Sequence, residues 1–378
     1  MTYTMVHLGE ITINADSRRK PLNERQRAAI SKEKRYPYIG ANNIIDYVDE
    51  YLFDEKILCV AEDGGYWGAG EHCAFLYEGK CWVNNHAHVL LETSHAKLEY
   101  VRFYLNHADL SSHITGTTRG KLTKADLERI ILPLPSIPEQ EKLVAIFQEA
   151  DDLINKRKEA LLLQDQLLQS YFHERFGDLV QNPKSFEIFP LQELCDVRDG
   201  THESPRYVQA GYPLITSRNL AGGDIDFRGA KCISEKDFHE INKRSKVDRG
   251  DILLPMIGTI GNPVLVQTDA AFAIKNVALL KFPDQGRITN RYMKGVLDSH
   301  YFTNWVEKVH RGGTQRFISL GDLRAMPIPL PPLREQMAFG QLAEHIERQK
   351  RMMQAQLTAL EEQAQSIRHC AFQGKLTG

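Results

Sequence analysis

The strongest constraint on this chain is an internal repeat with a spacing of about 196 residues. The segment LPSIPEQ at 134–140 returns as LPPLREQ at 330–336. Each copy leads into a long stretch without proline whose apolar residues have helical spacing. The match continues upstream, where Asp126 corresponds to Asp322. A repeat of this kind predicts a duplicated unit that consists of a globular domain and a long helix.

A further correspondence has a different offset. The tetrapeptide YPYI at 36–39 matches YPLI at 212–215. The change of offset predicts loops of different length between matched elements. We therefore expect the globular parts to have diverged more than the helices.

The repeat divides the chain into four segments. We predict a first globular domain at 1–133, a first helical region at 134–178, a second globular domain at 179–329 and a second helical region at 330–378. Both globular parts contain short apolar runs bounded by glycine-rich turns, together with short helical stretches. This pattern predicts an α+β fold of mixed α/β character for both domains.

The two long helices are expected to pair with each other. Each should run for about 38 residues, or about 57 Å, which is too long to pack on one small domain along its whole length. Antiparallel pairing as a coiled coil would relate the two halves by a pseudo-twofold axis. The residues expected to form the seam are Phe147, Ile154, Leu161 and Leu168 on the first helix and Ile346, Met353, Leu360 and Ile367 on the second.

The ends of the first helix carry local signals. Ser136 and Glu139 have the spacing of a capping box, and Pro138 lies in the first turn, where its missing N–H costs nothing. Gly177 follows the last apolar turn. It is predicted to be the C-cap.

Composition excludes some classes of protein. The chain is 42% hydrophobic and 25% charged, and it has no run of 18 apolar residues and no export signal at its start. We therefore expect a cytoplasmic protein without a membrane partner. The six cysteines show no disulfide-like spacing, which fits a reducing compartment.

A cluster of histidines and cysteines in the first domain raises the question of a zinc site. Its members are His72, Cys73, Cys81, His86 and His88. Their spacing fits no common ligand pattern, and the repeat has Asn276 and Ala278 in place of His86 and His88. Packing of a strand is the better interpretation, so no metal is expected.

Basic residues are clustered although the net charge is only −2. Eight basic and three acidic residues lie between Asp16 and Arg35, and the second half has KRSK at 243–246 and RGGTQR at 311–316. Any one of these runs could simply be a solvated face. Their presence in both repeats favours contact with a nucleic acid.

Together these motifs resemble the specificity subunit of type I restriction-modification enzymes, over essentially the whole chain. The second domain is most typical of that family in DGTHESP at 199–205, TSRN at 216–219, RGDIL at 249–253 and GTIG at 258–261. The first domain departs from the family pattern. It has EKIL at 55–58 where the second has GDIL, and it lacks DGTH.

The resemblance implies two target recognition domains, each of which reads one half of an asymmetric, gapped target in double-stranded DNA. It also implies that the helices set the gap and dock modification (methyltransferase) subunits, two of them, and that restriction (motor-nuclease) subunits join the complex. No cofactor is expected on this chain. S-adenosylmethionine, ATP and Mg²⁺ are expected on the partner subunits.

Candidate DNA contacts come from both domains. Arginine and lysine attract phosphates, and arginine and asparagine can make paired hydrogen bonds to purine edges. Asn42 and Asn43, matched with Arg218 and Asn219, follow the repeated Tyr-Pro strand and are predicted to read bases. The full set is Arg18, Arg19, Lys20, Arg25, Arg27, Asn42, Asn43, Arg119, Lys121, Thr201, His202, Ser217, Arg218, Asn219, Lys243, Arg244, Lys246, Arg311, Thr314, Gln315 and Arg316.

Catalytic motifs are missing from the sequence. It has neither a glycine-rich cofactor loop nor the N/D-P-P-F/Y/W tetrapeptide of an adenine methyltransferase. GTTRGKL at 116–122 fails as a P-loop because its glycine spacing is short by one and Leu122 replaces the magnesium-binding hydroxyl. The chain is therefore expected to be non-catalytic by itself, which argues against a stand-alone nuclease or methyltransferase. A coiled-coil adaptor with paired protein-binding domains is the alternative, but divergent domains beside retained helices argue against it.

Overall fold

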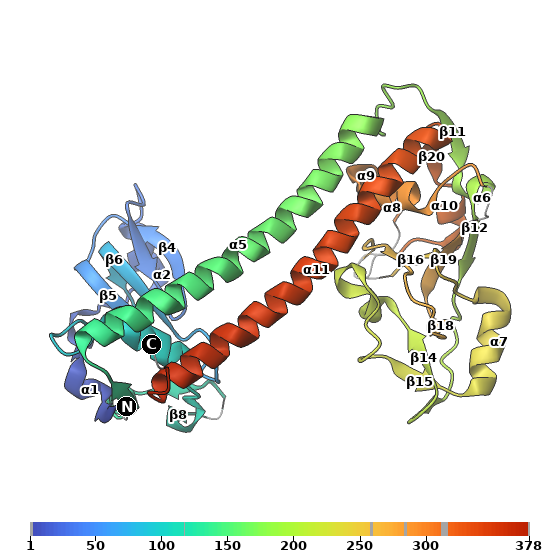
Figure 1. The fold of residues 1–378 in the computed structure, drawn as a ribbon. Helices are drawn as coiled ribbons and strands as arrows, with labels where there is room; N and C mark the ends of the chain where they lie inside the picture. Colours follow the sequence, from blue (N-terminus) through green and yellow to red (C-terminus); the bar gives the residue numbers. More distant parts are fainter. Residues whose placement is uncertain (1–2, 117, 258–259, 283–285, 311–316, 377–378) are drawn as a thin grey trace. The chain divides into compact units, whose positions relative to one another are not determined.

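A computed structural model describes residues 3–116, 118–257, 260–282, 286–310 and 317–376 (Figure 1). The chain forms two compact units. Unit 1 is Met1–Glu159 with Gln354–Gly378, and unit 2 is Ala160–Met353. The helices α5 (Ile137–Phe176) and α11 (Leu333–Phe372) contribute to both units. This division differs from the four predicted segments, because it shares each long helix between the units.

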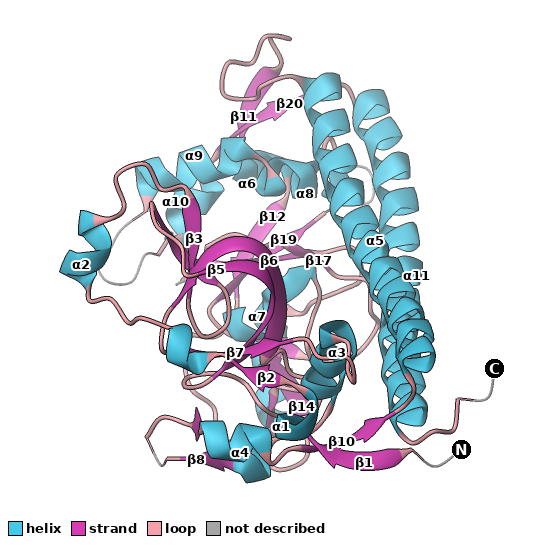
Figure 2. Ribbon diagram, turned by 90° about the vertical axis from the view of Figure 1, so that its left-hand side faces the viewer, coloured by secondary structure: helices cyan, strands magenta, loops and turns pink. Residues whose placement is uncertain are grey.

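Unit 1 is built on a six-stranded sheet of order β2-β7-β5-β6-β3-β4, in which only the β3–β6 pair is parallel. The strands β5 and β6 form the strongly curved ribbon in Figure 2. Residues 57–61 of β5 are fully buried, which explains their apolar run. The strands are β2 (Ile13–Asn14), β3 (Tyr36–Ile39), β4 (Ile44–Val48), β5 (Phe53–Ala61), β6 (Ala74–Val83) and β7 (Ala87–Leu91).

Smaller elements complete unit 1. Two-stranded antiparallel pairs are formed by β1 with β10 and by β8 with β9. The remaining elements are β1 (Thr4–His7), α1 (Leu8–Ile11), η1 (Asp16–Arg18), α2 (Glu24–Ala29), α3 (Leu98–His107), η2 (Ser111–His113), β8 (Ile114–Thr115), β9 (Lys121–Leu122), α4 (Lys124–Glu128) and β10 (Ile131–Leu134).

Unit 2 has two four-stranded sheets, of order β12-β19-β16-β17 and β13-β15-β14-β18, and a two-stranded pair of β11 with β20. Its strands are β11 (Glu187–Pro190), β12 (Asp196–Asp199), β13 (Tyr207–Val208), β14 (Tyr212–Ile215), β15 (Lys231–Ile233), β16 (Ile252–Pro255), β17 (Val264–Leu265), β18 (Ala273–Ile274), β19 (Val277–Lys281) and β20 (Pro327–Leu330). Its short helices are α6 (Leu191–Leu194), η3 (Ser217–Gly223), α7 (Glu235–Ser245), α8 (Asn290–Asp298), α9 (His300–Val309) and α10 (Leu320–Arg324).

The two units share one topology, which confirms the predicted duplication. The Tyr-Pro strands β3 and β14 each pair in parallel, β3 with the end of β6 and β14 with β18. In unit 1 the long strand β6 pairs with both β5 and β3. In unit 2 two short strands take the corresponding positions, because β17 pairs with β16 in one sheet and β18 pairs with β14 in the other. The hydroxyls of Tyr100 and Tyr292 donate equivalent hydrogen bonds to the carbonyls of Pro133 (2.7 Å) and Pro329 (2.6 Å).

The long helices pair antiparallel within each unit, as predicted. In unit 1, Asp151 pairs with Arg368 and Lys158 pairs with Glu361 (2.8 Å). In unit 2, Asp165 pairs with Lys350, and the rings of Phe172 and Phe339 pack at 5.2 Å. Later residues of α5 therefore face earlier residues of α11 in both units.

The seam contains the predicted residues and several more. Phe147, Ile154 and Ile346 are buried, and Leu161, Leu168, Met353, Leu360 and Ile367 are half-buried. Further buried apolar side chains of α11 are Phe339, Ala343, Leu357, Ala364 and Ala371. With the predicted residues they alternate spacings of three and four, except for one step of seven between Ile346 and Met353, which is the pattern of a coiled coil. Three of the five are alanines, which made this half of the seam hard to see in the sequence.

The C-terminal end of α5 has the predicted cap, whereas at its N-terminal end the Glu139 side chain bonds a residue outside the predicted capping box. Gly177 has a φ of +75° and donates to the His173 carbonyl at 2.7 Å, so the predicted C-cap is confirmed. At the other end, the Glu139 carboxylate accepts a hydrogen bond from the Tyr3 hydroxyl at 2.8 Å. Within the residues described, no helix combines the length and apolar character needed to cross a membrane.

Candidate nucleic-acid interface

Unit 1 gathers predicted contact residues from distant parts of the sequence around two acidic residues that follow β5. Arg119 lies 2.7 Å from Asp63, and Lys121 lies 3.1 Å from Glu62. Asn42, from the loop after β3, donates to the carbonyl of the residue next to Asp63 at 3.2 Å. Three of the predicted residues therefore share one surface, which we call the unit 1 polar surface.

His86 also belongs to the unit 1 polar surface. Its Nδ1 lies 2.9 Å from both carboxylate oxygens of Asp63. The side chain of Arg119 is 62% exposed, whereas that of Asp63 is only 18% exposed. A shielded carboxylate thus holds Arg119 and His86, and this arrangement can present their exposed edges to phosphates or base edges.

Arg19 lies beneath this surface and corrects the prediction that it contacts DNA. Its guanidinium is 12% exposed and bonds to Glu62 (2.7 Å), to Asp16 (3.1 Å) and to the Ala87 carbonyl (2.6 Å). Because these internal acceptors already engage the side chain, Arg19 stabilises the fold under the surface instead of projecting from it.

His88 completes this buried layer. Its Nε2 lies 2.8 Å from the Leu122 carbonyl, which can only accept, so Nε2 carries a proton. Its Nδ1 lies 2.6 Å from Asp16. Burial by itself would raise the pKa of Asp16, but hydrogen bonds from His88 and the Val89 N–H, with the charges of His88 and Arg19, lower it.

Asp16, Glu62 and His88 each place one possible ligand atom within 4.8 Å of the others. Arg19 already bonds both carboxylates, and both nitrogens of His88 face protein oxygens. These contacts favour an internal ion-pair network over a cation site. They agree with packing as the interpretation of His88, whereas His86 precedes β7 and lies on the unit 1 polar surface.

The other basic residues predicted in unit 1 lie apart from this surface or have no described link to it. Arg18 pairs with Glu55 at 2.7 Å and stacks over Phe53, at the opposite end of β5. Arg27 pairs with Asp46 at 3.0 Å. The remaining predicted residues of this region are exposed and are Lys20, Arg25 and Asn43.

Unit 2 has its own polar surface, centred on Asp199 at the end of β12. The carboxylate forms an ion pair with Arg244 and lies 2.8 Å from His202 Nε2. The side chain of Asp199 is 6% exposed, whereas those of His202 and Arg244 are 61% and 67% exposed. The hydrogen bond to Asn276 (2.8 Å) and then the one to Asp199 raise the pKa of His202.

The backbone fixes the turn that carries His202. Thr201 N–H donates to the Ile274 carbonyl (3.1 Å), and Asn276 N–H donates back to the Thr201 carbonyl (3.1 Å). A Cβ on Gly200 would lie 2.4 Å from the Ile274 oxygen, so this close approach requires glycine. The DGTH motif is thus a turn locked to the turn between β18 and β19.

The other predicted contact residues of unit 2 differ in exposure and in bonding partners. Asn219 is buried and closes a capping box with Thr216, so its amide is not available at the surface. Lys243 pairs with Glu240 (2.6 Å), and Lys246 pairs with Asp248 (2.7 Å). Arg218 is exposed and Ser217 half-buried beside Asn219. Arg311, Thr314, Gln315 and Arg316 lie outside the described residues.

Asp16 and Asp199 are structural equivalents that the sequence comparison missed. Asp199 ends β12 and pairs with Ala278 of β19, whereas Asp16 lies in η1 just after β2, and its carboxylate contacts His88 and the Val89 N–H of β7. Each binds an arginine and a histidine. The sequence does contain the signal: LGEI at 8–11 precedes Asp16 by the same distance as LQEL at 191–194 precedes Asp199.

Comparison with known proteins finds relatives that are named as specificity subunits of type I restriction enzymes. A Haemophilus influenzae protein named as a type I restriction enzyme specificity subunit is 26% identical over 346 residues, which is 87% of this chain and 83% of that protein. The MjaVIII specificity subunit of Methanocaldococcus jannaschii is 23% identical over 376 residues, 91% of this chain and 87% of that protein.

Solved structures share the fold. The S subunit of a type I restriction-modification system from M. genitalium superposes with a TM-score of 0.61 at 14% identity, over 98% of this chain and 96% of that one. A chain from a type I R-M system gives 0.57 at 18% identity, over 99% and 98%. The model of the type I restriction modification DNA specificity domain matches residues 2–164 and 183–362. The chain therefore belongs to the type I restriction modification DNA specificity family and carries the domain of that family twice.

Proposed function

We propose that this chain is the DNA specificity subunit of a type I restriction-modification complex and that each unit reads one half of a bipartite target. The observation that carries the proposal is that the family domain occurs twice, once in each repeat, and that each repeat presents a polar surface on which a shielded carboxylate holds an exposed arginine. A DNA specificity family also favours this function over the coiled-coil adaptor.

The two surfaces differ in the groups that they present. Unit 1 offers Arg119, Lys121 and Asn42, whereas unit 2 offers His202 and Arg244. Base edges in the major groove are distinguished by the donors and acceptors that meet them. Two unlike surfaces are therefore suited to two unlike half-sites, which is the requirement of an asymmetric target.

The long helices would set the gap between the half-sites and dock the modification subunits. Leu162, Leu163 and Leu167 of α5 are more than half exposed, away from the buried seam. Exposed leucines in a row are unusual on a free surface and suit a protein partner. We propose two modification subunits at the helices and restriction subunits that join the larger complex.

Chemistry would reside on the partner subunits. We propose that this chain neither transfers methyl groups nor cleaves DNA alone, and that S-adenosylmethionine, ATP and Mg²⁺ bind to the modification and restriction subunits. The basis is the absence from the sequence of a cofactor loop and of the tetrapeptide that holds a flipped adenine.

Methylation mapping tests the proposal. DNA modified in cells by this chain together with its modification subunit should carry methyl groups at one asymmetric motif with two specified parts and an unspecified gap. Purified chain without that subunit should transfer none. A contiguous motif, or methyl transfer by the pure chain, would contradict the proposed function.

A further inference from the structure

We propose that Asp199 is a positioning residue for DNA recognition by unit 2. It would not touch DNA itself, but would hold His202 and Arg244 in the fixed arrangement that meets the second half-site. This inference rests on the proposed function and deepens it. The reason is that one shielded carboxylate joins two exposed cationic groups that come from different parts of unit 2.

The carboxylate uses its two oxygens for two different tasks. Oδ2 faces His202 Nε2 at 2.8 Å, and Oδ1 faces the Arg244 guanidinium. His202 follows β12 directly, whereas Arg244 lies in the last turn of α7. Asp199 therefore ties the end of a helix to the turn after a strand and sets the distance between the two cationic groups.

Further contacts restrict both groups. His202 Nδ1 lies 2.8 Å from Asn276 Oδ1, so the imidazole ring is held on both sides. Arg198 donates to the Arg244 carbonyl at 3.0 Å, which holds the end of α7. Long side chains lose rotamer freedom when they bind, and a group that is already oriented loses less. Preorganisation of this kind favours discrimination between bases.

The equivalent residue in unit 1 shows which part of the arrangement is general. Asp16 also bonds an arginine and a histidine, but there the Arg19 side chain is largely shielded and His88 is buried. In unit 1 the exposed cation Arg119 is held one layer further out, by Asp63. The buried aspartate is thus common to both units, whereas only in unit 2 does it contact the exposed groups directly.

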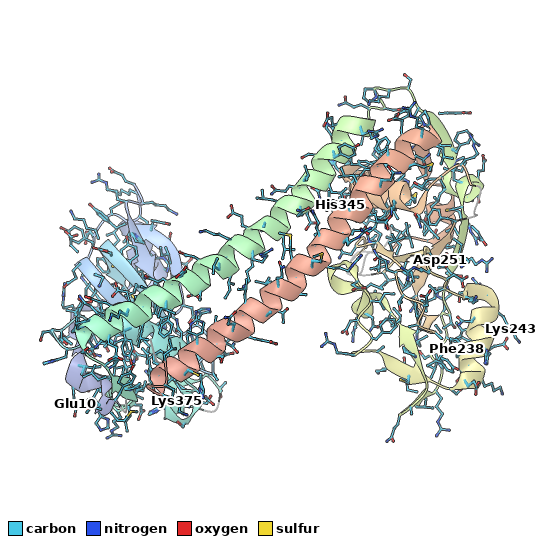
Figure 3. All side chains as sticks on the ribbon, in the orientation of Figure 1. Glu10, Phe238, Lys243, Asp251, His345 and Lys375 are labelled. Atoms are coloured by element: carbon cyan, nitrogen blue, oxygen red, sulfur yellow. The ribbon has the colours of Figure 1, made fainter. Side chains whose placement is uncertain are left out.

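Unit 2 also supplies a matched control. Asp251 is buried and paired with Lys281, whose side chain is mostly shielded. Figure 3 shows Asp251 among the strands of unit 2, while Lys243 of α7 lies at the outside. Asp251→Asn removes a buried carboxylate of the same unit without releasing an exposed arginine. It therefore measures the general cost of losing such a group.

The test is a set of variants in the assembled complex with its modification subunits, measured on DNA that carries either the correct or an altered second half-site. Arg244→Ala and His202→Ala should each reduce discrimination at that half-site by roughly 5- to 100-fold. Asp199→Asn should give a similar loss, and should add little in the Arg244→Ala, His202→Ala background. None of these variants should change discrimination at the first half-site. Asp251→Asn should leave discrimination at both half-sites unchanged.

Two results would overturn the inference. If the loss caused by Asp199→Asn multiplies with that of the double variant, or equals that of Asp251→Asn, Asp199 has only a structural role and the proposed function still stands. If Arg244→Ala and His202→Ala leave discrimination unchanged, the unit 2 polar surface does not read DNA. The inference about Asp199 and the proposal that this surface reads the second half-site are then both wrong.

A second measurement does not depend on folding of Asp199→Asn. Because one carboxylate holds both exposed groups, removal of either should disturb the other. Each single alanine variant should therefore show most of the loss seen in the double variant. Losses that multiply independently would contradict the shared role of Asp199.

Discussion

Gln140 and Gln336 occupy the same fully buried position in the two repeats, each as the last residue of the duplicated motif. The Gln140 side chain accepts a hydrogen bond from Lys97 N–H (2.9 Å) and donates to the carbonyls of His95 (3.0 Å) and Pro135 (2.9 Å). The motif therefore ties the start of the long helix to the unit that precedes it.

Gln336 repeats these contacts. It accepts from Thr289 N–H (2.8 Å) and donates to the carbonyls of Arg287 (3.0 Å) and Pro331 (2.8 Å). Lys97 and Thr289 are the N-cap residues of α3 and α8. Each glutamine thus satisfies backbone groups of a neighbouring segment, which explains why this residue recurs although the surrounding domains differ.

Gln336→Ala should destabilise unit 2. The change leaves the Thr289 N–H and two carbonyls without their partner in a buried place, which costs about 1–3 kcal/mol. Chemical denaturation followed by fluorescence measures the loss. Gln341→Ala, at an exposed position of the same helix, should change the free energy of unfolding by less than about 0.5 kcal/mol. Equal effects of the two variants would show that the buried contacts do not matter.

The fold was predictable where local pattern and repetition agreed. The duplicated motif and the heptad spacing predicted two long antiparallel helices, and the Tyr-Pro strands predicted equivalent places in the two sheets. Strand order was not predictable, because pairing between distant strands leaves no local trace. The alanines of the seam were missed for a related reason, since Ala364 and Ala371 are buried by packing and carry no strong apolar signal.

The candidate site was predictable only in part. Basic composition pointed to Arg119 and Arg244, but it could not separate exposed cations from Arg19, which internal carboxylates engage. Acidic residues were overlooked because a DNA-binding surface was expected to be basic. Asp63 and Asp199 are nevertheless the residues that hold the exposed arginines of the two surfaces, and these partners are brought together only by folding.

The charge of His202 should make recognition by unit 2 depend on pH. Its pKa is raised above 6.5 in the folded protein, so protonation of His202 stabilises the fold fully below about pH 6.5. That stabilisation is lost as the pH rises through the raised pKa. Affinity for the second half-site should fall over the same range, because the imidazolium loses its charge.

Affinity measured at about pH 6 and about pH 8.5 checks this. His202→Gln should remove the additional decrease in affinity for the second half-site between these two pH values. The pH dependence of affinity for the first half-site should stay the same. The titration of His202, followed by NMR, should lie above that of an exposed histidine. A pH response that is identical in His202→Gln would assign it to another group.

Leu163→Asp should reduce assembly with modification subunits but spare folding. Leu163 is 55% exposed, so a charge there meets water in the free chain and becomes buried only at an interface. Size-exclusion chromatography of the co-expressed subunits measures assembly. Ile13→Asp, at an exposed strand position of unit 1, should leave assembly intact, and Leu357→Asp, in the buried seam, should disrupt the helix pair. Normal assembly of Leu163→Asp would place docking elsewhere.

The helices should act as a ruler. One heptad added to α5 after Glu159 and one added to α11 after Met353 preserve the seam and lengthen the helix pair by about 10 Å. At about 3.4 Å per base pair, the preferred gap should grow by about three base pairs. A lone two-residue insertion should instead turn the apolar stripe by about 200° and impair folding. An unchanged gap in the doubly extended protein would mean that partner subunits position the units.

The most direct test compares the methylation motifs produced by complexes that carry Arg119→Ala, Arg244→Ala or the control Arg129→Ala. Arg129 is an exposed arginine of unit 1 outside the polar surface. We predict that Arg119→Ala relaxes the sequence of one half-site, that Arg244→Ala relaxes the other, and that Arg129→Ala gives the parental motif. Relaxation of the same half-site by both changes, or of both half-sites by either, would contradict the claim that each unit reads its own half of the target.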